Sequence, residues 1–112
     1  VEQVGTPREL YERPRTATVA RFLGEANILT REQAAPFAPV ASTVCLRPER
    51  IRFAAEGVPA TIVDGSYQGD RAVWTVDAGG LRLTAVETAP PERAAGDAVH
   101  LRVDAADLVG LA

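Results

Sequence analysis

The chain has 112 residues, of which 46% are hydrophobic and 24% charged, enough for one small domain that buries about 65% of its unfolded surface. The net charge of −3 and the 5% aromatic content argue against a nucleic-acid-binding surface, which needs a basic groove with stacking platforms. One cysteine excludes an intramolecular disulfide and fits a reducing cytoplasm. No apolar run approaches the roughly 20 residues that span a bilayer.

The N-terminal residues predict the end of a strand followed by a short helix. Residues 1–4 have the apolar pattern of a strand end. Thr6 can cap a helix over residues 7–13, with Glu9 at the reciprocal position of a capping box and Pro14 as the stop. A chain that begins on the last residues of a strand is expected to have been cut from a larger protein.

A second short helix is predicted over residues 16–23, ended by a glycine. It would carry an apolar face made of Val19, Phe22 and Leu23. Neither helix is long enough to be stable alone, so both must pack against a neighbouring structure. Residues 30–42 lack a helical or strand period and predict a flexible surface loop.

From Thr43 onward the hydrophobic pattern has the period of two that is typical of half-buried antiparallel strands. Tight turns are predicted at residues 68–70 and 78–80, where glycine accepts a positive φ. Strands of this length and spacing favour a small barrel or sandwich. The inward positions are expected to be Val44, Leu46, Ala72, Trp74, Val76, Leu81, Leu83, Val99, Leu101 and Val103.

Five motifs in a fixed order resemble one family. They are QVGTPRELYERP at residues 3–14, VARFLGEAN at 19–27, LRPERI at 46–51, YQG at 67–69 and AGGL at 78–81. Together they resemble the ATP-binding subunits of bacterial ABC importers, where such a sequence leaves the ATPase domain and enters a C-terminal TOBE domain. The resemblance implies a mainly β, OB-like small antiparallel barrel with a short helical connector. We therefore expect the connector over residues 1–26 and the TOBE-like domain over residues 27–112.

Catalytic motifs are missing from this sequence. It has no GxxxxGK[ST] phosphate loop, no apolar run ending in Asp-Glu and no LSGGQ-like stretch, so we expect no catalytic, cofactor or metal site in it. His100 is interpreted as a solvated strand histidine and Cys45 as a small packing residue. The resemblance implies that ATP and Mg²⁺ are cofactors of the complete subunit only.

Arg47 and Glu49 are candidate contacts to a partner domain or an anion. Alternatively, Pro48 only ends a strand and the flanking charges are solvated or paired across the turn. Tyr67 and Trp74 could form a stacking surface for a sugar or base, or a cross-strand core pair, which we favour. Three aspartates near the expected hairpin ends could form a cation site, namely Asp64, Asp70 and Asp77. Aspartate is also a favoured turn residue, and this explanation suffices.

The resemblance implies a non-catalytic regulatory or accessory domain of an importer subunit that serves polyamines, ferric iron or related solutes. Its expected partners are its own ATPase domain, the membrane permease and a second copy in a homodimer, with no nucleic acid. The face formed by Val19, Phe22 and Leu23 is a candidate interface. The expected location is cytoplasmic, peripheral to the inner membrane. The alternative is a free-standing OB-like module that binds a small anion or sugar.

Overall fold

A computed structural model describes residues 6–14, 16–22 and 25–111 of the chain. The chain divides into two compact units. The first unit comprises Val1–Arg47 and Asp104–Ala112, and the second comprises Pro48–Val103. The expected boundary after residue 26 stays a prediction.

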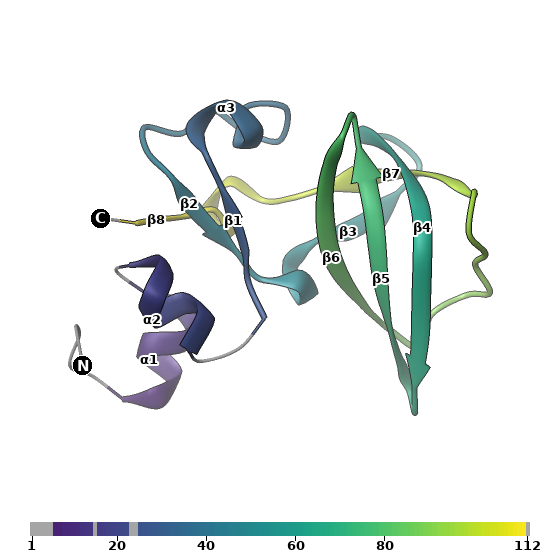
Figure 1. Cartoon of the computed structure of the whole chain (residues 1–112), viewed down its shortest axis with the longest axis horizontal. Helices are drawn as coiled ribbons and strands as arrows, with labels where there is room; N and C mark the ends of the chain where they lie inside the picture. The colour runs from purple at the N-terminus through teal and green to yellow at the C-terminus, as the bar shows by residue number, and fades with distance from the viewer. Residues whose placement is uncertain (1–5, 15, 23–24, 112) are drawn as a thin grey trace. The chain divides into compact units, whose positions relative to one another are not determined.

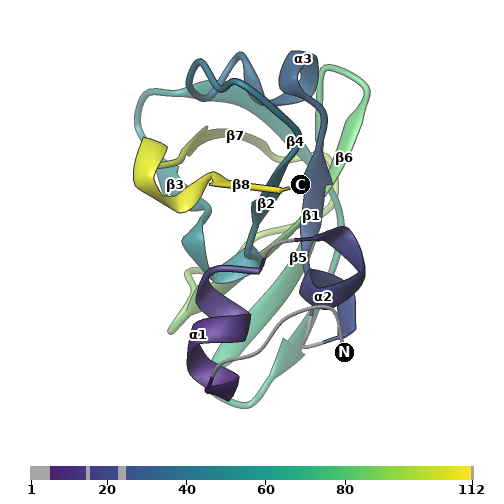
Figure 2. The same cartoon turned by 90° about the vertical axis from the view of Figure 1, so that its left-hand side faces the viewer.

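The first unit begins with two helices of six residues each, α1 (Pro7–Glu12) and α2 (Ala17–Phe22), seen in purple and dark blue in Figure 2. The Glu9 amide donates to the Thr6 hydroxyl oxygen at 3.2 Å, and this hydroxyl donates to the Glu9 carboxylate at 3.1 Å. The predicted Thr6 cap is confirmed, but the Glu9 carboxylate accepts from the Thr6 hydroxyl, whereas the predicted capping box would use the Thr6 amide. Both predicted helices are present with slightly shorter bounds. The strand end predicted over residues 1–4 lies outside the described residues.

A three-stranded antiparallel sheet follows in the first unit, with the strand order β1-β2-β8. It is built from β1 (Asn27–Leu29), β2 (Val44–Leu46) and β8 (Val109–Gly110). The prediction of a half-buried β2 is wrong, because every residue of this central strand is buried. Cys45 packs with Ala20 of α2 and with Leu111, which confirms it as a small packing residue.

The loop predicted over residues 30–42 contains a helix that sequence analysis missed, α3 (Arg31–Ala34). The Gln33 amide donates to the Thr30 hydroxyl at 3.2 Å, and the Thr30 amide donates to the Gln33 side-chain oxygen at 2.9 Å. This capping box stabilises four helical residues that have no apolar period of their own. A 3-10 helix, η2 (Ala105–Asp107), lies before β8.

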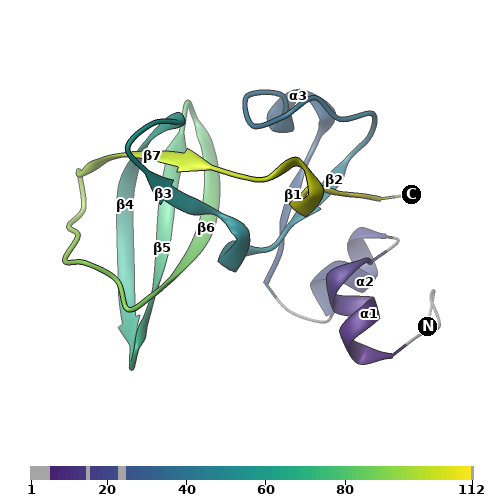
Figure 3. The ribbon, with the colours of Figure 1, turned by 180° about the vertical axis from the view of Figure 1, so that it is seen from behind.

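The second unit is a five-stranded antiparallel sheet with the order β3-β7-β4-β5-β6. Figure 1 shows the long neighbours β4, β5 and β6, and Figure 3 shows β3 beside β7. A 3-10 helix, η1, precedes β3. The bounds are η1 (Pro48–Arg50), β3 (Arg52–Ala54), β4 (Val58–Gln68), β5 (Arg71–Ala78), β6 (Leu81–Thr88) and β7 (Ala98–Arg102).

The mainly β, OB-like class is confirmed, but the expected closed barrel is not found. In the part of the chain that the structure describes, no ladder joins the edge strands β3 and β6, so the sheet stays open. Strands β5, β6 and β7 show the predicted alternation of burial. Both predicted turns contain glycines with positive φ, namely Gly69 at 71°, Gly79 at 63° and Gly80 at 93°.

The core of the second unit is formed by the inward side chains of its strands together with Ile51. It comprises Ile51, Ala60, Ile62, Ala72, Trp74, Val76, Leu83, Ala85, Val99 and Leu101. Within residues 6–14, 16–22 and 25–111, no helix has the length and hydrophobicity that crossing a membrane requires.

Candidate functional site

Arg47 follows the buried strand β2, and only 5% of its surface is exposed. Its Nε and Nη2 donate to the Tyr11 carbonyl oxygen at 3.2 and 2.9 Å. Its Nη1 donates to the carbonyl oxygens of Ala20 at 2.9 Å and Glu25 at 3.0 Å. The guanidinium carbon also lies 4.0 Å from the centroid of the Tyr11 ring. We call Arg47, Tyr11, Ala20 and Glu25 the Arg47 cluster.

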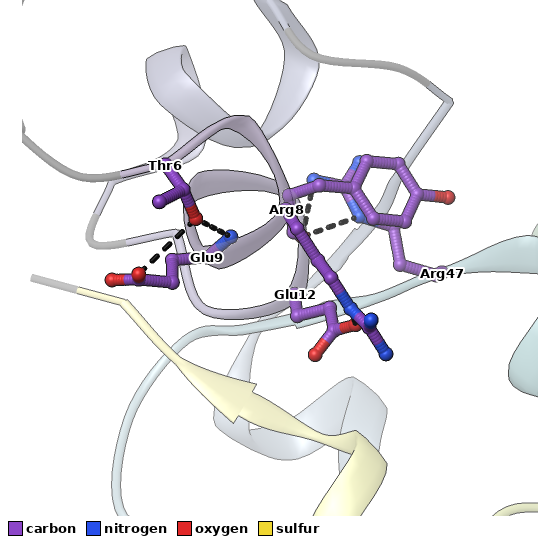
Figure 4. Close-up of polar contacts among 6 residues, drawn as sticks. Thr6, Arg8, Glu9, Glu12 and Arg47 are labelled. Carbon is purple, nitrogen blue, oxygen red and sulfur yellow. Dashed lines mark hydrogen bonds and ion pairs between the residues drawn. The ribbon is translucent and has the colours of Figure 1, made fainter.

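Figure 4 shows the Arg47 side chain directed at the helical segment that carries Arg8 and Glu12. The interpretation of Arg47 as a solvated charge is wrong, because its guanidinium is buried against backbone carbonyls of its own unit. A pairing of the charges across the turn stays a prediction. A contact from Arg47 to a partner or an anion stays a prediction. Arg8 and Glu12 form an exposed ion pair of 2.8 Å along α1.

The other candidate interface residues are placed differently. Glu49 is exposed in η1. Val19 and Phe22 belong to α2, but their side chains lie outside the described part of the structure, as does all of Leu23. The predicted apolar interface on α2 therefore stays a prediction.

A second group of side chains lies in the second unit and connects β5, β6 and the loop before β7. Trp74 Nε1 donates to Glu87 Oε1 at 3.0 Å. Arg93 donates to both oxygens of Glu87, from Nε at 2.9 Å and from Nη2 at 2.8 Å. The Arg93 guanidinium also lies 4.5 Å from the centroid of the Phe53 ring. We call Phe53, Tyr67, Trp74, Glu87 and Arg93 the Trp74 cluster.

The Glu87 carboxylate is the centre of the Trp74 cluster. The hydrogen bonds from Arg93 lower its pKa below the ordinary value, against the opposing effect of desolvation, and the bond from Trp74 acts in the same direction as Arg93. Glu87 therefore stays ionised at neutral pH and ties the loop that carries Arg93 to the sheet. Sequence analysis missed both charged residues, because their pairing depends on the path of an irregular loop.

The predicted core pair of Tyr67 and Trp74 is confirmed only in part. The two rings make an edge-to-face contact, with centroids 5.5 Å apart and planes at 83°. Trp74 is buried, but 56% of Tyr67 is exposed, so Tyr67 is not a core residue. The strand register explains the difference: Gly65 lies opposite Trp74, and Tyr67 reaches the indole only along the diagonal.

A hollow of about 310 Å³ lies beside the Trp74 cluster. Its lining combines the aromatic Phe53 and the cationic Arg93 with His100 and four small residues, Ala54, Ala55, Ala98 and Val99. His100 is exposed, as predicted. Among the described residues, no group of three or more His, Cys, Asp or Glu side chains is arranged to hold a metal ion.

The aspartates near the hairpin ends are consistent with the turn chemistry that the sequence predicts. Asp77 Oδ1 accepts a hydrogen bond from the Gly80 amide at 2.8 Å, and Asp77 Oδ2 accepts one from Arg82 Nε at 3.2 Å. Asp64 lies next to an irregularity in the pairing of β4 with β5. The Asp70 carbonyl accepts a hydrogen bond from the Ala89 amide at 2.7 Å.

These observations define the structural class of the protein as an antiparallel β domain of the OB-like class, preceded by two short helices. Residues 44–111 match the TOBE domain family, and the chain belongs to this family. The match begins at β2 and ends after β8, so it includes the whole second unit.

Similar proteins are ATP-binding proteins of transporters. The chain is 40% identical over 72 residues to the uncharacterized ABC transporter ATP-binding protein YdcT of Escherichia coli, covering 62% of this chain and 21% of YdcT. It is 34% identical to the Fe(3+) ions import ATP-binding protein FbpC of Streptomyces coelicolor, covering 99% of this chain and 37% of FbpC. It is 36% identical to the spermidine/putrescine import ATP-binding protein PotA of Marinobacter nauticus, covering 62% of this chain and 26% of PotA. The chain thus spans between about a fifth and somewhat over a third of the length of these relatives.

Proposed function

We propose that this chain is the TOBE region of the ATP-binding subunit of an ABC importer. The observation that carries the proposal is the alignment with the iron-import subunit of Streptomyces coelicolor, which covers 99% of the chain. That alignment extends beyond the TOBE match into the two N-terminal helices. The complete subunit would bind ATP and Mg²⁺ and couple hydrolysis to import, whereas this region would be non-catalytic.

The proposed role of the region is accessory or regulatory. Its partners would be the ATPase domain of the same subunit, a second copy of the subunit and the membrane permease, at the cytoplasmic side of the membrane. The relatives carry names for ferric iron, spermidine or putrescine, and glycerol 3-phosphate, so the TOBE region is shared by importers of different solutes. Polyamine or ferric iron is the solute that we propose for the parent.

A second candidate function is a small-ligand module. The hollow next to the Trp74 cluster favours it, because about 310 Å³ is near the lower end of small-molecule sites. Its lining includes Arg93, which is paired with Glu87, and the Phe53 ring on which Arg93 lies, so an anion or a sugar would have to share these groups with that pair.

Thermal unfolding of the 112-residue chain separates the two candidates. We expect no stabilisation by MgATP beyond that produced by the same ionic strength, because the sequence has no phosphate loop. A nucleotide-specific rise in the melting temperature would contradict the non-catalytic role. A saturable rise with inorganic phosphate or maltose that Arg93→Gln abolishes would favour the small-ligand module instead.

A further inference from the structure

We propose that Arg47 is a latch that fixes the helices α1 and α2 to the sheet β1-β2-β8 by capping the C-terminal ends of both helices at once. One buried guanidinium reaches three carbonyl groups that lie 22 to 36 residues away in the chain. All four residues of the Arg47 cluster belong to the first unit.

Two of the three carbonyl groups that Arg47 contacts are ones that a helix cannot satisfy by itself. The last four carbonyls of an α-helix have no partner within the helix. Tyr11 belongs to the last turn of α1, and Ala20 belongs to the last turn of α2. A positive charge at this end also interacts favourably with the negative end of the helix dipole. Arg47 thus contacts two helix ends, and it also binds the Glu25 carbonyl, two residues before β1 begins.

The two helices depend on such an external partner. Each has six residues, which is too short for a helix that is stable in water on its own. The last turn of α1 contains no basic residue that could cap it locally. Among the side chains of α2 that the structure describes, Ala20 packs on Cys45 and Leu111, with Ala17 at the margin. To these contacts Arg47 adds four charge-assisted hydrogen bonds to backbone carbonyls.

A lysine could not replace this latch. Its ammonium is a compact charge, whereas the planar guanidinium directs N–H groups to several acceptors at fixed angles. Arg47 uses Nε and Nη2 for one carbonyl and Nη1 for two others, and its flat face covers the Tyr11 ring. The geometry therefore selects arginine at this position.

The latch makes the order of α1 and α2 conditional on the Arg47 side chain, which follows β2. The second unit has its own buried core. Loss of Arg47 should therefore release the helices without unfolding the second unit. If the proposed function holds, these helices follow the ATPase domain, and Arg47 would be the residue through which a displacement of that domain reaches β2.

Amide hydrogen exchange on the 112-residue chain tests the latch. Arg47→Lys and Arg47→Gln are compared with the wild type, and Arg102→Lys and Arg102→Gln serve as matched controls on an exposed strand position. We expect exchange in residues 8–22 to accelerate at least about tenfold in both Arg47 variants. Exchange in β4, β5 and β6 should stay at the wild-type rate, and both Arg102 variants should behave like the wild type.

Chemical rescue provides the second measurement. In Arg47→Ala, guanidinium chloride at low, non-denaturing concentration should slow exchange in residues 8–22 again, while equal sodium chloride should not. The latch is refuted if these residues exchange at the wild-type rate in Arg47→Gln, or if the wild type already exchanges there without protection. An equal acceleration in both units would also refute it, because Arg47 would then support the whole fold. None of these outcomes depends on nucleotide binding, so the proposed function is tested separately.

Discussion

Gly65 has no room for a side chain, and replacing it with alanine tests the packing of the second unit. It lies in β4 directly opposite Trp74, and a Cβ built on it would overlap the Cε3 and Cζ3 atoms of the indole and lie 3.2 Å from Cδ2. Gly65 is not among the glycines with positive φ, so alanine is compatible with its backbone. Any loss of stability in Gly65→Ala must therefore come from the overlap of the new Cβ with the indole.

The magnitude follows from how firmly the indole is held. Overpacking a well-packed core costs about 1–3 kcal/mol. Trp74 is 2% exposed, and its Nε1 is hydrogen-bonded to Glu87, so the ring cannot move away without weakening that bond. Loss of the bond would add about 1 kcal/mol. We therefore expect Gly65→Ala to lower the free energy of unfolding by about 2–4 kcal/mol.

Urea unfolding followed by the fluorescence of Trp74, the single tryptophan of the chain, measures this cost. The control is the same substitution in a Trp74→Leu background, followed by circular dichroism. There the clash is absent, and the cost of Gly65→Ala should fall below about 0.5 kcal/mol, because alanine is not worse than glycine in a strand. An equal cost in both backgrounds, or a neutral Gly65→Ala in the wild type, would refute the steric argument.

Three further predictions concern the turn, the buried charge and assembly. Gly69→Val should lower the free energy of unfolding by more than about 1 kcal/mol, because φ is 71° at this residue, although the surrounding space is open. Gly69→Asn should lower it clearly less, and equal losses for the two variants in urea unfolding would contradict this reasoning. The stability that ionised Glu87 provides is present above its ordinary pKa of 4.5 and is lost as the pH falls through its lowered pKa in the folded state. Glu87→Gln should therefore have a lower free energy of unfolding than the wild type at pH 7 in chemical denaturation. This difference should become smaller in acid. A difference that does not change with pH would show that ionisation of Glu87 is irrelevant. The chain should form a homodimer through the α2 face, and a constant monomer mass in sedimentation equilibrium over about a hundredfold range of concentration would exclude this.

Much of the second unit could be predicted from sequence, because its strands follow simple rules. Alternating burial in β5 and β7 follows from the period of two, and the turn glycines follow from their need for a positive φ. Strand β2 could not be predicted in this way. Its pattern alternates, but its central position in a small sheet buries both faces. The short helix α3 was missed because its signal is a capping box and not an apolar period.

The two side-chain clusters were less accessible to sequence analysis. Arg47 was a candidate, but its partners are backbone carbonyls, which leave no trace in residue types. The close approach of Gly65 to Trp74 depends on the pairing register, and an irregularity between Ile62 and Asp64 shifts that register. The contact between Glu87 and Arg93 depends on the path of a loop. In each case, the decisive contact is set by tertiary geometry and not by a local pattern.

The coding sequence upstream of Val1 tests the central claim most directly. If the chain is the TOBE region of an importer ATPase subunit, the same reading frame should encode a GxxxxGK[ST] loop, an LSGGQ-like stretch and an apolar run ending in Asp-Glu, in that order. ATP hydrolysis by the complete product, and its loss on substitution of the phosphate-loop lysine, would then follow. A start codon close to Val1, with no such motifs before it, would contradict the account and favour a free-standing ligand-binding module.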